Sequence, residues 1–250
     1  MRLSHRKIAR SIAPLLVLLA LLTIGVSHAE ASDDRATYRV TITNLTTGQP
    51  LTPPVVATHR KPFHIFQVGQ VASFELKEIA ENGNNAPLLA ALGHDKHVSD
   101  VKQAGMGPLV PANTPGGATF PASVTFTITA ERGAKYLSFA AMLVCTNDGF
   151  TGVDSVRLPQ EDGERVTVRT AGYDAGTERN TEDFADIVPP CQALIGVSSG
   201  ESGTGMSNPA LAEHGVIRHH PGIQGGSDLV PAIHGWTDPV AKIVITRIDD

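Results

Sequence analysis

The sequence contains little cysteine and few aromatic residues, and positive charge is not in excess. Over 250 positions it has two cysteines and one tryptophan, and aromatic residues make up 5%. Lysine and arginine number 20 against 25 for aspartate and glutamate, which gives a formal net charge of -5 and a pI near 6.0. Proteins that bind nucleic acid concentrate basic residues against the phosphate backbone. The composition therefore predicts a partner other than nucleic acid.

The N-terminus has the pattern of a signal peptide. A basic head over residues 1–10 is followed by an apolar stretch over residues 12–26, and the small residues Ser27 and Ala29 have the spacing that a signal peptidase recognises. The stretch is shorter than the roughly 20 residues that a helix needs to cross a bilayer. We predict a signal peptide over residues 1–29, cleaved near Ala29, and a secreted or periplasmic protein with no transmembrane span after cleavage. An uncleaved N-terminal anchor is the alternative.

The remaining chain, residues 30–250, has the length that a single all-β domain commonly fills. Its two cysteines, Cys145 and Cys191, would both lie in an oxidising compartment after export. An even number of cysteines in such a compartment usually indicates a disulfide, so we expect these two to pair. Two buried free thiols are the alternative, because the sequence does not show how close the two residues lie.

Alternation of apolar and polar residues predicts several half-buried strands. It is strictest over residues 38–43 and 124–129, and it returns over residues 165–169 and 242–246. Residues 136–144 form a continuous apolar run, which is typical of a central strand covered on both faces. Residues 155–158 add a sixth strand. With Gly, Pro, Asn and Asp between them, these segments predict an all-β fold, an antiparallel β-sandwich.

Helix is predicted to be minor, with one or two short elements. Apolar residues have helical spacing over residues 71–81, which stop at Asn82-Gly83, and residues 87–92 can form a second short helix. Residues 197–239 are rich in Gly, Ser, His and Pro and show little periodicity. A segment of this length is either an ordered functional loop or a flexible one.

Two acidic segments are candidates for a metal site. Asp148 lies in the first, and Asp174, Glu178 and Glu182 lie in the second. Calcium takes six to eight oxygen ligands, and loops at one end of a sandwich can bring distant carboxylates together. Asp and Gly are also ordinary turn residues, and the segments match no EF-hand loop. From the residues alone, turn formation is the preferred interpretation.

These segments carry a family resemblance. Residues 143–156 read Leu-Val-Cys-Thr-Asn-Asp-Gly-Phe-Thr-Gly-Val-Asp-Ser-Val, and residues 173–178 read Tyr-Asp-Ala-Gly-Thr-Glu. They resemble the paired signatures of the spondin N-terminal domain, P-D-W-F-V-G-V-D-S and Y-D-A-G-T-D. Further similar segments are the opening strand at Tyr38, residues 51–59, the region after Gly69 and the closing strand over residues 239–247. The segment at residues 219–225 is similar to bacterial members of the family.

The resemblance implies an antiparallel sandwich of the type found in calcium-dependent membrane-binding modules, with one calcium ion between the two acidic loops. The matching ligands are Asp148 and Asp174. The family's third ligand is a glutamate on the preceding strand, where ungapped counting places Thr129. Glu131 shares the face of Thr129 if the strand continues, so we keep Glu131 as a third candidate, with Glu178 and Glu182 as alternatives.

Two further patterns bear on catalysis. The histidines His214, His219, His220 and His234 lie near Trp236, but no cysteine pair accompanies them as in a zinc motif, so packing and hydrogen bonding in a loop is the preferred interpretation. Residues 196–200 match G-x-S-x-G, although no strand-turn-helix pattern surrounds them, and we interpret them as a loop.

The sequence therefore predicts a non-catalytic, exported, calcium-binding adhesion or binding module with an unidentified extracellular or cell-surface ligand. Two alternatives remain. A metal-free structural protein of the envelope or matrix would use the acids only as turn residues. A metal-dependent hydrolase would need the histidine loop to supply a base beside Asp148.

Overall fold

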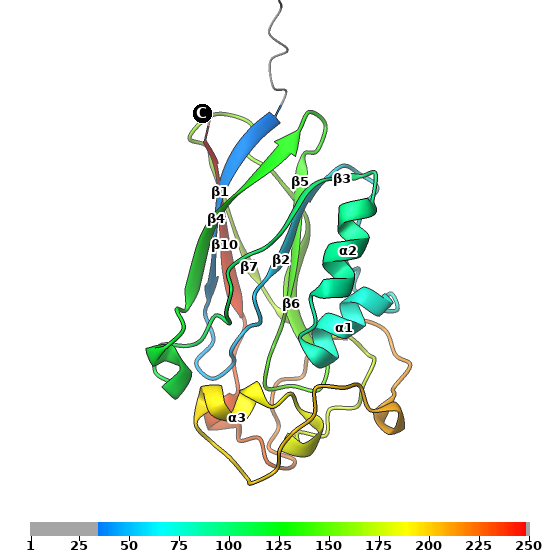
Figure 1. Ribbon diagram of the computed structural model, residues 1–250, viewed down its shortest axis with the longest axis vertical. Coiled ribbons are helices and arrows are strands. Elements are labelled where there is room, and N and C mark those ends of the chain that lie inside the picture. Colours follow the sequence, from blue (N-terminus) through cyan, green and yellow to red (C-terminus); the bar gives the residue numbers. More distant parts are fainter. Residues whose placement is uncertain (1–34, 249–250) are drawn as a thin grey trace, which may run out of the picture. The chain divides into compact units, whose positions relative to one another are not determined.

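The computed structural model describes residues 35–248, and the predicted signal peptide lies outside them. Ten strands form two antiparallel sheets that pack face to face (Figure 1). The first sheet has the order β4-β1-β10-β7. Its strands are β1 (Arg35–Asn44), β4 (Ser123–Glu131), β7 (Arg165–Thr170) and β10 (Ala241–Ile248). The all-β sandwich expected from the alternating segments is confirmed.

The second sheet has six strands in the order β3-β2-β5-β6-β8-β9. They are β2 (Val55–His59), β3 (Val98–Gln103), β5 (Tyr136–Met142), β6 (Gly149–Arg157), β8 (Gly172–Asp174) and β9 (Arg218–His219). All but the first residue of β5 are buried, as the apolar run predicts for a strand covered on both faces. Residues 155–157 of the segment predicted over 155–158 form the end of a longer strand, β6, that begins at Gly149.

The space between the two sheets holds one hydrophobic core. Val40 and Ile42 of β1 and Ile243 and Ile245 of β10 face Phe139 and other residues of the six-stranded sheet, and all five are fully buried. Burying a side chain of this size contributes roughly 1.5–3 kcal/mol. The period of two along β1 and β10 therefore fixes which face of the four-stranded sheet points inward and leaves the other face in solvent.

A second core covers the outer face of the six-stranded sheet. Helices α1 (Phe74–Asn82) and α2 (Ala86–His94) pack on this face, and both lie on the right in Figure 1. Ser73 caps α1, since its side chain accepts a hydrogen bond from the Leu76 N–H, and Gly83 ends it at φ 63°. The two predicted short helices are confirmed with shifted ends. Among residues 35–248 there is no helix with the length and apolar character of a membrane span.

The lower end in Figure 1 is built from loops and short helices rather than strands. Its helical pieces are α3 (Pro190–Ile195), α4 (Pro231–His234), η1 (Pro115–Ala118), η2 (Phe184–Asp186) and η3 (Pro209–Leu211). Cys145, just after β5, forms a disulfide with Cys191 of α3, with the two Cα atoms 5.0 Å apart. The predicted pairing is confirmed. We refer to this end, where residues 143–149, 174–182 and 213–226 meet, as the loop end.

The match to G-x-S-x-G does not form a nucleophile elbow. Helix α3 ends at Ile195, directly before the motif, and Gly196 is its C-cap at φ 80°. A helix followed by a turn is the reverse of the strand-turn-helix that an elbow requires. The interpretation of residues 196–200 as a loop is supported.

Candidate functional site

A tight turn between β5 and β6 points the Asp148 carboxylate into the loop end. The Thr146 hydroxyl donates to the Leu143 carbonyl at 2.6 Å and accepts from the Gly149 N–H at 2.9 Å. A Cβ on Gly149 would stand 2.5 Å from the Thr146 Oγ1, so no larger residue fits there. The Asn-Asp-Gly sequence of the turn therefore places Asp148 at the first residue before β6.

One oxygen of Asp148 is fully engaged and the other is not. Oδ2 accepts hydrogen bonds from the backbone N–H groups of Thr177 at 2.8 Å and Glu178 at 3.0 Å, and from the Thr177 hydroxyl at 3.2 Å. Oδ1 is buried and accepts no hydrogen bond from any residue that the structure describes. A buried acceptor without a donor is costly, and it marks a position that a proton or a cation would stabilise.

The environment raises the pKa of Asp148 to about 7. The main cause is burial, since the side chain is fully shielded from solvent, and the second is the nearby negative charge of Asp174. Both disfavour the charged carboxylate. We call Asp148 and Asp174 the carboxylate pair.

Asp174 ends β8 and lies opposite Gly149 in the β6–β8 ladder. Its Oδ1 accepts from the Gly176 N–H at 2.8 Å, and its Oδ2 accepts from the Asn180 side chain at 2.8 Å and the Arg218 guanidinium at 3.1 Å. Arg218 of β9 also donates to Glu213 at 2.8 Å. The charge of Asp174 is thus balanced within the protein, whereas no ion pair joins Asp148 to a cation among residues 35–248.

Glu178 and Glu182 follow in the same loop, and both are buried. The Glu178 Oε1 accepts from the Asn208 N–H at 2.9 Å. Burial raises the pKa of Glu178 to about 7, with further contributions from the charges of Glu81 and Asp148. The Glu178 backbone contacts Asp148, so this residue belongs to the same cluster of buried acids.

Glu182 has a different task. Its two carboxylate oxygens accept three backbone hydrogen bonds, from Gln224 at 2.5 Å, Gly225 at 2.7 Å and Gly226 at 2.6 Å. The residue itself stands at φ 58°, a conformation that is rare for a glutamate. The carboxylate is occupied in holding the 224–226 segment, which removes it from the set of free metal ligands.

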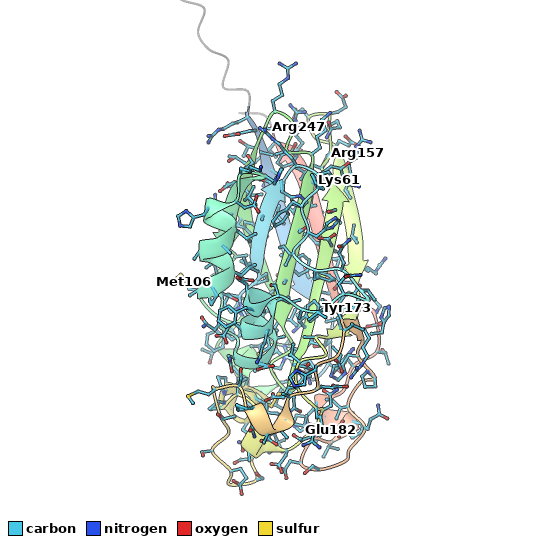
Figure 2. All side chains as sticks on the ribbon, turned by 90° about the vertical axis from the view of Figure 1, so that its right-hand side faces the viewer. Lys61, Met106, Arg157, Tyr173, Glu182 and Arg247 are labelled. Carbon is cyan, nitrogen blue, oxygen red and sulfur yellow. A yellow bond between two sulfur atoms is a disulfide. The ribbon has the colours of Figure 1, made fainter. Side chains whose placement is uncertain are left out.

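Against the expectation from sequence, the structure does not bring Glu131 to the carboxylate pair. Glu131 pairs in register with Arg35 at the end of β4, and its carboxylate forms ion pairs with Arg35 at 3.2 Å and Arg60 at 3.4 Å. This is the end of the sandwich that carries Arg247, opposite the loop end marked by Glu182 in Figure 2. Glu131 precedes β5 and Asp148 follows it, so the two residues lie at opposite ends of that strand. Thr129, the ungapped match, hydrogen-bonds to Asp100 of β3.

His219 and His220 are engaged in packing or hydrogen bonds, and His234 accepts from the Val230 N–H at Nδ1, while its buried Nε2 has no hydrogen-bond partner among residues 35–248. The His220 ring lies 5.0 Å from the Trp236 ring, its Nε2 is 3.2 Å from the Asn180 Oδ1, and its Nδ1 accepts from the Gly222 N–H. Burial lowers the pKa of His220 to about 4, so the ring is neutral near pH 7. His219 lies against Tyr173 with ring centroids 5.3 Å apart. With both ring nitrogens occupied, His220 is not placed to act as a base.

Several residues that sequence reasoning missed organise the site. Asn147 binds the loop across the turn, accepting from the Thr181 N–H at 3.1 Å and donating to its hydroxyl at 3.1 Å. Arg218 supplies the cation for Asp174 from 44 residues away, a separation at which no local pattern connects them. Sequence reasoning could have found Asn147, because this residue stands beside Asp148 in the motif.

The described residues contain no group of three or more His, Cys, Asp or Glu side chains arranged to hold a metal ion. Comparison with known families gives one finding. A family model described as Spondin_N matches residues 45–185, more than half of the chain, and the matched region includes both residues of the carboxylate pair. No curated protein matches the sequence.

Proposed function

Since the chain belongs to the Spondin_N family, we propose that it is an exported, non-catalytic binding module that takes up one calcium ion at the carboxylate pair. The observation that carries the proposal is the buried Asp148 Oδ1, which accepts no hydrogen bond from the described residues and lies near a second carboxylate. Calcium prefers hard oxygen donors of this type. When bound, it would neutralise the negative charge of the two aspartates.

The residues at hand fit a calcium ion as far as their donor chemistry goes. Asp148 and Asp174 supply two carboxylates, and Glu178 is the remaining buried acid whose backbone contacts Asp148. Because no third metal-binding side chain among residues 35–248 is in position, backbone carbonyls and water would complete the shell. Asp148 and Asn147 already hold residues 177–182 through hydrogen bonds, so a cation there would rigidify the surface of the loop end.

Arg218 is the built-in competitor of such an ion. Its guanidinium already donates to Asp174 Oδ2 at 3.1 Å, and its positive charge would repel a cation bound by the same carboxylate. Loss of this side chain would leave Asp174 uncompensated and more available to an added cation. We therefore expect Arg218→Gln to lower the stability of the calcium-free protein and to raise its affinity for calcium.

A thermal melt with calcium and with chelator tests the proposal. At free calcium about 100-fold above the dissociation constant, linkage predicts roughly 2.7 kcal/mol of added stability, a shift of several degrees in Tm. Asp148→Asn and Asp174→Asn should abolish the shift. Glu161→Gln, which removes a charge from an exposed turn, should retain it. Isothermal titration of the same four proteins with calcium gives the stoichiometry, expected to be one.

A metal-free structural protein is the second candidate function, and the Arg218–Asp174 ion pair favours it, because that pair already supplies a cation to one member of the carboxylate pair. The same melt separates the two. An unchanged Tm in calcium, together with no heat of binding, would leave the acids as loop-building residues and make the structural function the better supported.

A further inference from the structure

The outer face of the four-stranded sheet has an unusual composition. The register of β4, β1, β10 and β7 aligns its outward positions in rows, and Figure 1 shows α1 and α2 on the other side of the sandwich. Most outward positions carry a hydroxyl group. They are Thr37, Thr41, Thr43, Ser123, Thr125, Thr127, Thr129, Thr167 and Thr246. We call this surface the threonine–arginine face.

Positive charge is concentrated on this face although the protein as a whole is acidic. The five cations among the rows are Arg35, Arg39, Arg165, Arg169 and Lys242. The acid on these outward positions is Glu131, at the far end of β4, and it is neutralised by Arg35 and Arg60. The composition of the whole chain hides this asymmetry, so a basic surface is not predicted from the net charge.

Two of the cations face each other directly. Lys242 of β10 is the register partner of Arg169 of β7, and Arg39 and Arg165 flank Thr246 in another row. Paired positions on neighbouring strands lie about 5 Å apart, and like charges at such positions destabilise a sheet. An anion that bound between them would relieve this repulsion.

Protection of a sheet edge does not account for the pattern. Positive side chains on an edge strand prevent pairing with another chain, which suits Arg165 and Arg169 on β7. Arg39 and Lys242, however, lie on β1 and β10, which have partners on both sides. Their charge serves no edge.

We infer that the threonine–arginine face binds an anionic polysaccharide. Guanidinium groups pair with carboxylate and sulfate groups, and rows of hydroxyls match the hydroxyls of sugars. Along β7 the two arginines are four residues, or roughly 13 Å, apart, so the cations suit a chain of repeated charges better than a single anion. A bilayer is less suited, since this face carries no large aromatic side chain to enter it.

Binding of the purified protein to heparin and to polygalacturonate, by titration calorimetry with chelator present, tests the inference. We compare wild type with Arg39→Gln/Lys242→Gln and with the charge-matched control Lys96→Gln/Lys135→Gln, whose residues lie outside the face. The face variant should bind one or both polymers about tenfold more weakly. The control should stay within about twofold of wild type. Raising salt should weaken the wild-type interaction.

Several results would contradict the inference. Failure of wild type to bind either polymer, or an equal loss in the control variant, would overturn the inference. So would tighter binding to anionic vesicles or to duplex DNA than to the polysaccharides. Should the first variant not fold, as judged by its melt, Arg165→Gln/Arg169→Gln on the edge strand serves in its place. The chelator separates this result from the calcium site, because the face does not involve Asp148 or Asp174.

Discussion

At the loop end, Asp148, Glu178 and Glu182 are 0 to 6% exposed, whereas on the threonine–arginine face Arg39, Arg165 and Arg169 stand in solvent. The first region gathers negative charge in the interior from residues far apart in the chain, and hydrogen bonds from loop backbones hold it. The second presents positive charge outside on regular strands. Buried charge in this protein is therefore tied to stability, while exposed charge is free to serve binding.

If contacts between residues far apart in the chain stabilise the loop end, its disulfide should make the largest contribution to the free energy of unfolding. Cys145 and Cys191 close a loop with a sequence separation of 46, for which the chain-entropy model gives about 4 kcal/mol of stabilisation. We expect Cys145→Ala/Cys191→Ala to lose stability of this order in urea denaturation. Polysaccharide binding by the folded variant should be unchanged. A loss below about 1 kcal/mol would show that the hydrogen bonds alone hold the loop end.

The buried acids should give the calcium-free protein a characteristic pH dependence. Asp148 and Glu178 have folded pKa values of about 7, above those of the unfolded chain, so the folded state keeps protons that the unfolded state has lost. Their stabilising contribution is therefore full below pH 4 and is lost as the pH rises to 7. The loss amounts to up to about 4 kcal/mol for Asp148.

The measurement is the difference in unfolding free energy between wild type and Asp148→Asn from pH 4 to pH 8 in chelator. As the pH rises, the unfolding free energy of wild type should fall relative to that of Asp148→Asn. The double variant Asp148→Asn/Glu178→Gln should enlarge this change. Taking the difference cancels His59, His220 and His234, whose pKa values are lowered by burial. Those histidines contribute with the opposite sign, since their stabilisation is lost as the pH falls below 6.5. A pH-independent difference would mean that Asp148 is ionised throughout.

The fold follows from sequence where one face of a strand is buried. β1 and β4 alternate strictly because the sandwich core takes every second residue. β3 was not predicted because its residues are at most partly buried, so they show no alternation. β8 and β9 were not predicted because they are only three and two residues long and form by pairing with neighbouring strands. Short strands of that kind have no local signal.

Less of the candidate site than of the fold could be predicted from the sequence. The residues alone favoured turn formation at Asp148 and Asp174, and the resemblance to spondin N-terminal domains favoured their role as ligands; the structure places them near each other. Glu131 lies apart from them because strand direction decides which end of the sandwich a residue reaches. Neither the ion pair of Arg218 nor the role of Glu182 could be read from spacing, since both depend on how residues 213–226 fold back on the loop.

Glu182 provides a smaller test of the loop end. Its carboxylate accepts three backbone hydrogen bonds from residues 224–226, and hydrogen bonds to a charged group contribute about 1.5–3 kcal/mol. Glu182→Gln should lose about 2 kcal/mol and speed hydrogen exchange in residues 222–230, while exchange in β1 and β10 stays slow. Glu161→Gln, an exposed glutamate outside the cluster, is the matched control. Unchanged exchange in the 222–230 segment would assign its order to other contacts.

The threonine–arginine face should show the smallest effect on stability and a selective effect on binding. The hydroxyls of Thr41 and Thr125 hydrogen-bond to each other at 2.8 Å on the exposed side of β1 and β4. Valine keeps the branched shape that strands favour, so Thr41→Val/Thr125→Val should change the unfolding free energy by less than about 0.5 kcal/mol. Affinity for the polysaccharide should nevertheless fall about threefold, since two sugar-binding hydroxyls are gone. Thr47→Val/Thr237→Val, at exposed positions in loops, should leave that affinity unchanged, and an equal fall in both variants would mean that the hydroxyl rows make no specific contact.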